Sequence, residues 1–107
     1  MEGLVANGVG DPHELLVALG HPRRRQILRA AILGKRPISP RELADEMDLG
    51  LSNVSYHVRV LMDCKVLDLT GTKAVRGSVQ HFYVANAAVS ETPWVREALE
   101  LGPPDAD

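Results

Sequence analysis

The sequence predicts one mainly α-helical domain that carries a single β-hairpin. Its 107 residues, 45% of them hydrophobic, suffice for one core. Two runs that favour β-structure, residues 66–70 and 78–84, are bounded by Gly71 and Gly77. Four prolines stand where helices are expected to begin, at the N1 position that tolerates proline best: Pro12, Pro22, Pro40 and Pro93. With an amphipathic segment at 51–61, these patterns predict about five helices and one hairpin.

The first two helices are expected at residues 13–20 and 22–33, each after a proline. The second has a predicted buried face of Ile27, Leu28, Ala31 and Ile32 and an exposed face of Arg23, Arg24, Arg25 and Arg29. Arg23–Arg25 either contacts phosphate or forms a solvated helix start, and the sequence favours neither interpretation.

The third helix has a strong start signal. Ser39 is the predicted N-cap, Pro40 occupies N1 and Glu42 occupies N3, which is a capping box. Its predicted buried edge is Leu43, Ala44 and Met47. Gly50 is expected to end this helix, and Ser52 to cap the next one after a turn of about four residues.

The segment 51–61 carries the functional prediction. Leu51, Val54, Val58 and Leu61 form an apolar stripe that docks on a core. The opposite face has no acidic residue until Asp63, and its short polar groups, phenol and guanidinium suit contacts with base edges and phosphates. This face consists of Ser52, Asn53, Ser55, Tyr56 and Arg59. The two helices predict a helix-turn-helix whose second helix enters the major groove; an ordinary polar surface helix is the alternative.

The hairpin completes a winged helix-turn-helix. Residues 72–76 are expected to form its basic tip, where Lys73 and Arg76 contact the DNA backbone. Residues 11–89 therefore form the predicted DNA-binding domain, after a flexible segment 1–10.

The last helix, expected within residues 90–101, begins at Thr92-Pro93. Its apolar face is Trp94, Val95, Ala98, Leu99 and Leu101. This face packs either into the core or against a second copy, and a dimer interface of Trp94, Val95, Ala98 and Leu101 is the favoured hypothesis. Residues 102–107 are expected to be a disordered tail.

Several stretches together resemble the ArsR-type winged-helix repressors. They are residues 18–28, Glu42-Leu-Ala44, residues 53–61 and Phe82-Tyr83. The resemblance spans about residues 13–84. It implies a recognition helix in the major groove, a wing on the backbone, and first and last helices that form a dimer interface. Metal-sensing members often have Cys-x-Cys before the turn or histidine ligands on the last helix, and this chain has neither. Metal sensing is therefore not implied, and any effector is unknown.

The charge distribution agrees with DNA binding. The net charge is −2, but residues 20–90 sum to +5 while residues 1–19 and 91–107 sum to −3 and −4. A local basic field steers the encounter with a polyanion.

No membrane span or signal peptide is recognisable, and one cysteine cannot form an internal disulfide, so a reducing cytoplasm is expected. The sequence shows no Gly-rich phosphate loop, paired carboxylates or Ser/His/Asp arrangement, which argues against an enzyme. No cofactor or metal is expected. His57 is interpreted as a packed or helix-capping residue, with a phosphate contact or a pH-sensitive group as alternatives. Cys64 is interpreted as a small buried hydrophobe.

The predicted function is a cytoplasmic transcriptional regulator, a repressor that binds an inverted repeat in double-stranded DNA as a homodimer. The alternative is a winged-helix module that docks an acidic protein partner.

Overall fold

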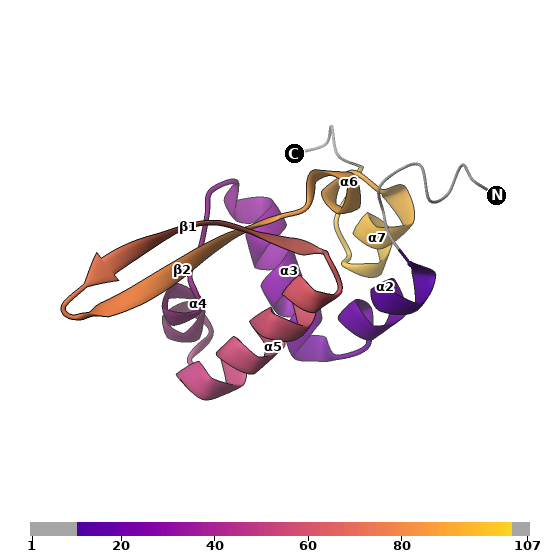
Figure 1. Cartoon of the computed structure of the whole chain (residues 1–107). Coiled ribbons are helices and arrows are strands. Elements are labelled where there is room, and N and C mark those ends of the chain that lie inside the picture. Colours follow the sequence, from indigo (N-terminus) through magenta and orange to yellow (C-terminus); the bar gives the residue numbers. More distant parts are fainter. Residues whose placement is uncertain (1–10, 104–107) are drawn as a thin grey trace.

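The structure, a computed structural model, describes residues 11–103, which form six helices and one hairpin (Figure 1). The predicted flexible segment 1–10 and the last four residues of the predicted tail lie outside the described residues. The hairpin projects from the helical body and gives principal-axis extents of 48 × 24 × 23 Å (Figure 1). The elements are α2 (Pro12–Leu19), α3 (Pro22–Gly34), α4 (Pro40–Met47), α5 (Leu51–Asp63), β1 (Leu67–Val75), β2 (Ser78–Ala85), α6 (Ala87–Ser90) and α7 (Pro93–Ala98).

Proline begins four helices, as predicted, and three of them have a side-chain cap. Asp11 accepts a hydrogen bond from the His13 N–H at 2.8 Å, and Nδ1 of His21 accepts one from the Arg23 N–H at 3.0 Å. The predicted capping box of α4 is present, because Ser39 Oγ accepts from the Glu42 N–H and Glu42 Oε1 accepts from the Ser39 N–H. One helix was not expected from the sequence, the single turn α6.

The turn between α4 and α5 differs from the prediction. Helix α4 ends because Asp48 adopts the left-handed conformation, with φ 56°. Gly50 instead has extended backbone and serves as the N-cap of α5, without a side-chain hydrogen bond. The predicted roles of Gly50 as terminator and Ser52 as cap are therefore wrong: the N-cap of α5 is Gly50, and the helix begins two residues earlier than a Ser52 cap implies, at Leu51. Asp can adopt the left-handed conformation more readily than most residues, which made glycine unnecessary there.

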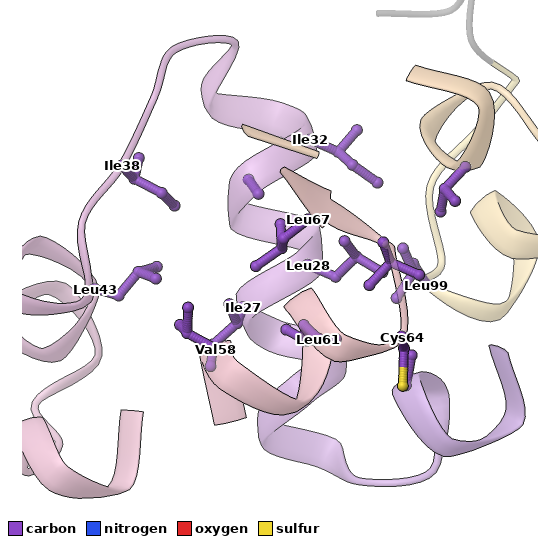
Figure 2. Close-up of a cluster of buried hydrophobic side chains, with 14 of the residues drawn as sticks. Ile27, Leu28, Ile32, Ile38, Leu43, Val58, Leu61, Cys64, Leu67 and Leu99 are labelled. Atoms are coloured by element: carbon purple, nitrogen blue, oxygen red, sulfur yellow. The ribbon is translucent and has the colours of Figure 1, made fainter. Parts of the chain in front are cut away.

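The core is formed where α3 crosses the other helices and the base of the hairpin (Figure 2). The four apolar residues predicted to be buried on α3 are buried, with Ile27 and Leu28 fully inaccessible. On α5, Val54, Val58 and Leu61 join them, whereas Leu51, the first residue of the predicted stripe, is 40% exposed. The stripe thus begins one turn later than predicted, because the first residue of α5 extends beyond the core.

The hairpin is longer than predicted. Strands β1 and β2 pair antiparallel from Leu67–Ala85 to Val75–Ser78, with a register shift between Leu69 and Gly71. The chain reverses at Arg76 and Gly77, whose φ values of 52° and 83° are both left-handed, as a two-residue hairpin turn of type I′ requires. Of the predicted tip, residues 72–76, only Arg76 lies in the turn; residues 72–75 belong to β1, because Gly71 adjoins an irregularity inside the strand and does not end it.

The C-terminal helices close the other end of the core. Val89, Val95 and Leu99 are fully buried, and Arg29 Nε donates a 2.8 Å hydrogen bond to the Leu99 carbonyl. Helices α2, α6 and α7 lie at the end of the molecule away from the hairpin tip (Figure 1). None of the helices in residues 11–103 is long and apolar enough to cross a membrane.

Candidate nucleic-acid interface

Helix α5 has one face in the core and one in solvent. Val54, His57, Val58 and Leu61 are buried. The opposite face, here called the recognition face, consists of the five predicted residues Ser52, Asn53, Ser55, Tyr56 and Arg59. Four of them are exposed, Tyr56 to 60%, and Ser55 is half-buried. The first acidic side chain on α5 is Asp63, its last residue, so the recognition face presents no carboxylate to a polyanion.

A groove separates α5 from the wing. It has a volume of about 470 Å³ and lies between the start of α4, one side of α5 and strand β2. Ser55 and Arg59 line it from the recognition face, opposite Gln80 and His81 of β2. This concave surface, called the wing groove below, joins the recognition face to the hairpin.

The structure adds Arg41 to the candidate site. Arg41 is the second residue of α4, is exposed, and lines the wing groove together with Arg59. From the sequence, only the buried edge of that helix was predicted, and Arg41 was not among the predicted site residues. Its position directly after Pro40 could have indicated that it is exposed, because a capped helix start fixes which side chains of the first turn face solvent.

The two predicted wing cations occupy different positions on the hairpin. Arg76 is the first residue of the turn, as expected for a tip residue. Lys73 lies within β1, paired with Gln80, and is therefore part of the ladder. Both are exposed. His81 pairs across the strands with Thr72.

Within residues 11–103, the four cations of the candidate site take part in no ion pair. Residues 11–103 contain two ion pairs, Arg36–Glu42 at 3.5 Å and Lys65–Glu14 at 3.6 Å. Neither pair includes the cations of the candidate site, which are Arg41, Arg59, Lys73 and Arg76. Their charges are thus not neutralised by a neighbouring carboxylate and are available to phosphate.

The arginine cluster at the start of α3 has a structural role. Arg24 donates to the Val17 carbonyl from Nε and Nη2, at 3.1 and 2.9 Å, and Arg25 donates to the Leu19 carbonyl at 2.6 Å. These carbonyls belong to the last turn of α2, where a helix leaves acceptors unsatisfied. Arg24 and Arg25 therefore cap α2. This role is neither the phosphate contact nor the solvated helix start that the sequence left open.

His57 is packed, in agreement with the first of the interpretations above. Its side chain is 4% exposed, and its Nδ1 lies 3.3 Å from Arg24 Nη1. The His21 ring lies on its other side, with 4.4 Å between ring centroids. Burial lowers the pKa of His57 below the ordinary histidine value, and His21, Arg24 and Arg23 lower it further.

Cys64 is also buried, as predicted. Burial is the main cause that raises the pKa of its thiol, and nearby Glu14 adds to the effect. Within residues 11–103, no group of three or more His, Cys, Asp and Glu side chains is arranged to hold a metal ion.

The predicted dimer face divides into two parts. Val95 is fully buried in the chain's own core, and Leu101 is half-buried against it. Trp94 is 49% exposed, and Ala98 is exposed as well. Only the Trp94–Ala98 side of α7 therefore offers apolar surface to a partner. On α2, Leu16 is 68% exposed and Val17 is 38% exposed, and neither was noted in the sequence.

Comparison with known proteins supports this architecture. A helix-turn-helix domain family matches residues 19–70, which include α3, α4, α5 and the start of β1. Among solved structures, HlyU from Vibrio cholerae N16961, a winged helix-turn-helix protein of the ArsR/SmtB family, is similar with a TM-score of 0.58 and 25% identity. The similarity covers 94% of this chain and 91% of HlyU. No curated protein sequence gave a match. The fold and the resemblance expected from the sequence are thereby confirmed.

Proposed function

We propose that this chain, which carries a helix-turn-helix DNA-binding domain on the winged fold of the ArsR-type regulators, binds a specific duplex sequence and regulates transcription. The recognition face would enter the major groove with its first turns towards the base edges. The wing would follow the flanking backbone.

One observation carries the proposal: the exposed polar face of α5 has no carboxylate, and the cations around it, Arg41, Arg59, Lys73 and Arg76, take part in neither ion pair of residues 11–103. Asn53 and Tyr56 lie early on α5, where base contacts are usual. Arg41 and Arg59 flank the wing groove, through which a phosphate backbone would pass. A protein-docking module would need neither an acid-free face nor this alternation of short polar groups and cations.

The proposed active species is a cytoplasmic homodimer that represses by covering a promoter. The support for dimerisation is the exposed apolar surface of α7 and α2, where Trp94 and Leu16 are the largest side chains. Two symmetric subunits would recognise an inverted repeat, with half-sites about one helical turn, roughly 10 bp, or a multiple of it apart.

Selection of bound duplexes from a random oligonucleotide pool tests the proposal. The expected result is an enriched inverted repeat that the protein prefers over random DNA by about 10³-fold or more at physiological salt. A triple variant, Asn53→Ala with Tyr56→Ala and Arg59→Ala, is the matched control and should enrich nothing.

Enrichment of no sequence by the wild type would contradict the proposal. If an acidic protein still bound the same surface in that case, the chain would be a winged-helix docking module.

A further inference from the structure

The buried His57 connects the recognition face to the interior of the molecule. It lies beside Tyr56 in the chain, and the two rings meet edge to face with 5.1 Å between centroids. On its inner side, His57 Nδ1 is 3.3 Å from Nη1 of Arg24. Arg24 is itself fixed by two hydrogen bonds to the Val17 carbonyl. A continuous chain of contacts thus runs from α2 through Arg24 and His57 to Tyr56.

The partners of His57 define its protonation state. A guanidinium has only donors, so Nδ1 of His57 must accept, and the ring is neutral with its hydrogen on Nε2. The neighbouring His21 also uses its Nδ1 as an acceptor, for the Arg23 N–H at the start of α3. In the His57 ring, the atom that would take up a second proton is thus already in use as an acceptor.

The charges around His57 all oppose its protonation. His21, Arg23 and Arg24 face it from the start of α3, and its neighbour on α5 is the phenol of Tyr56. Neither ion pair in residues 11–103 includes His57. A proton on Nδ1 would remove the acceptor of Arg24 and place a cation against a guanidinium, inside a site that is 4% exposed.

We propose that His57 positions the recognition face and that its protonation weakens the binding of duplex DNA, an inference that rests on the function proposed above. The protonated ring would have to leave its place between Arg24 and His21. Tyr56 and the first turns of α5 would then lose their support from α3.

The expected direction in pH follows from linkage. Because the pKa of His57 in the folded chain lies below the 6.5 of an ordinary histidine, the unfolded chain takes up this proton first as the pH falls. The native arrangement is therefore fully stable above about pH 6.5 and loses stability as the pH falls below it. Ordinary electrostatics gives the opposite direction for DNA binding, since acidification adds positive charge to a protein that faces a polyanion.

The experiment measures affinity for the selected operator between pH 7.5 and 5.5 at constant ionic strength, with folding checked by circular dichroism. The wild type should lose about tenfold in affinity over this range; linkage allows at most about tenfold per pH unit for each proton, and so about a hundredfold for a dimer with one proton per protomer. His57→Asn retains an acceptor for Arg24 but cannot titrate, so its binding should tighten on acidification. Arg24→Gln removes the nearest cation and should move the loss to higher pH. His13→Gln, at an exposed position on α2, is the matched control and should follow the wild type.

The outcomes separate this inference from the proposed function. Absence of specific binding already at pH 7.5 overturns the proposed function, and the pH coupling with it. Specific binding that stays constant or tightens towards pH 5.5, or a wild-type profile in His57→Asn, overturns the role of His57 alone. If His57→Asn does not fold, Arg24→Gln and an NMR titration of the His57 ring decide: a ring that titrates at or above pH 6.5 contradicts the proposal.

Discussion

Tyr56 and His57 are neighbours in the sequence but have opposite surroundings. Tyr56 is 60% exposed on the recognition face, and His57 is 4% exposed between α5 and α3. The alternation of polar and apolar residues predicted the exposure of Tyr56. The same pattern favoured a packed His57 but did not identify its partners, because the residues that surround it come from the start of α3, with Arg24 33 positions away in sequence. Contacts of this kind are set by tertiary packing and leave no local signal.

The candidate site separates residues expected to contact bases from residues expected to contact phosphate. Asn53→Ala or Tyr56→Ala should weaken binding to the preferred site by about 1–3 kcal/mol and leave random-DNA affinity nearly unchanged. Arg41→Ala or Arg76→Ala should weaken both, and should reduce the slope of log K against log salt by about 0.9 per lost contact. Lys73→Ala tests whether a cation within β1 contributes to the salt dependence as Arg76 in the turn is expected to do. Salt titrations with specific and random duplexes measure both effects.

The docking geometry would be contradicted if substitutions on the wing changed sequence preference while those on α5 did not. Gln26→Ala, at an exposed position on α3, is a suitable control and should change neither quantity.

The thiol of Cys64 should react slowly in the native protein. It is buried, and its pKa is raised chiefly by burial, so little reactive thiolate forms near neutral pH. A disulfide-exchange reagent at pH 7.5 should modify it much more slowly than in denaturant. Rapid native labelling, or loss of DNA binding on mild oxidation that Cys64→Ser prevents, would contradict this prediction.

At the scale of elements, helix starts were predicted better than turns. Proline and a short capping side chain act within three residues, so their signal is local, as the capping box of Ser39 and Glu42 illustrates. The turns depend on backbone conformations that several residue types can adopt. Asp48 ends α4 in the left-handed conformation, a role that was expected of Gly50, and Arg76 shares the left-handed hairpin turn with Gly77.

This difference gives a stability test with a built-in control. Ser39 is fully buried and caps α4, so Ser39→Ala should lower the free energy of unfolding by about 1–2 kcal/mol. Ser52 is exposed and caps nothing, so Ser52→Ala should change it by less than about 0.5 kcal/mol. Chemical denaturation measures both. An equal loss in the two variants would show that Ser52 caps α5 in solution after all.

For the molecule as a whole, the amphipathic pattern of the last helix was correct but its interpretation was incomplete. A stripe of apolar residues indicates that one face of the helix is covered. It does not indicate whether the chain's own core or a partner covers that face. Val95 is covered by the chain's own core, whereas Trp94 remains half exposed. Sequence reasoning assigned both to one interface, because the position of α7 on the core depends on contacts with distant helices.

Dimerisation should therefore depend on Trp94 and not on Val95. Trp94→Ala should shift the protein towards monomer in sedimentation velocity at tens of micromolar, roughly the range in which weak dimers form. Leu33→Ala, at a 48% exposed apolar position on α3, is the matched control and should leave the distribution unchanged. A wild type that is monomeric at these concentrations would contradict the proposed homodimer.

The hydrogen bond from Arg29 to the Leu99 carbonyl has a consequence for the order of events during synthesis. Its two residues are 70 positions apart, so at about 5–20 residues per second a ribosome needs roughly 4–14 s to supply the second after the first. Helix formation takes about a microsecond or less. The nascent chain thus holds α3 with part of its apolar face uncovered for seconds, until Val95 and Leu99 arrive. Ribosome stalling between α6 and α7 would prolong that interval.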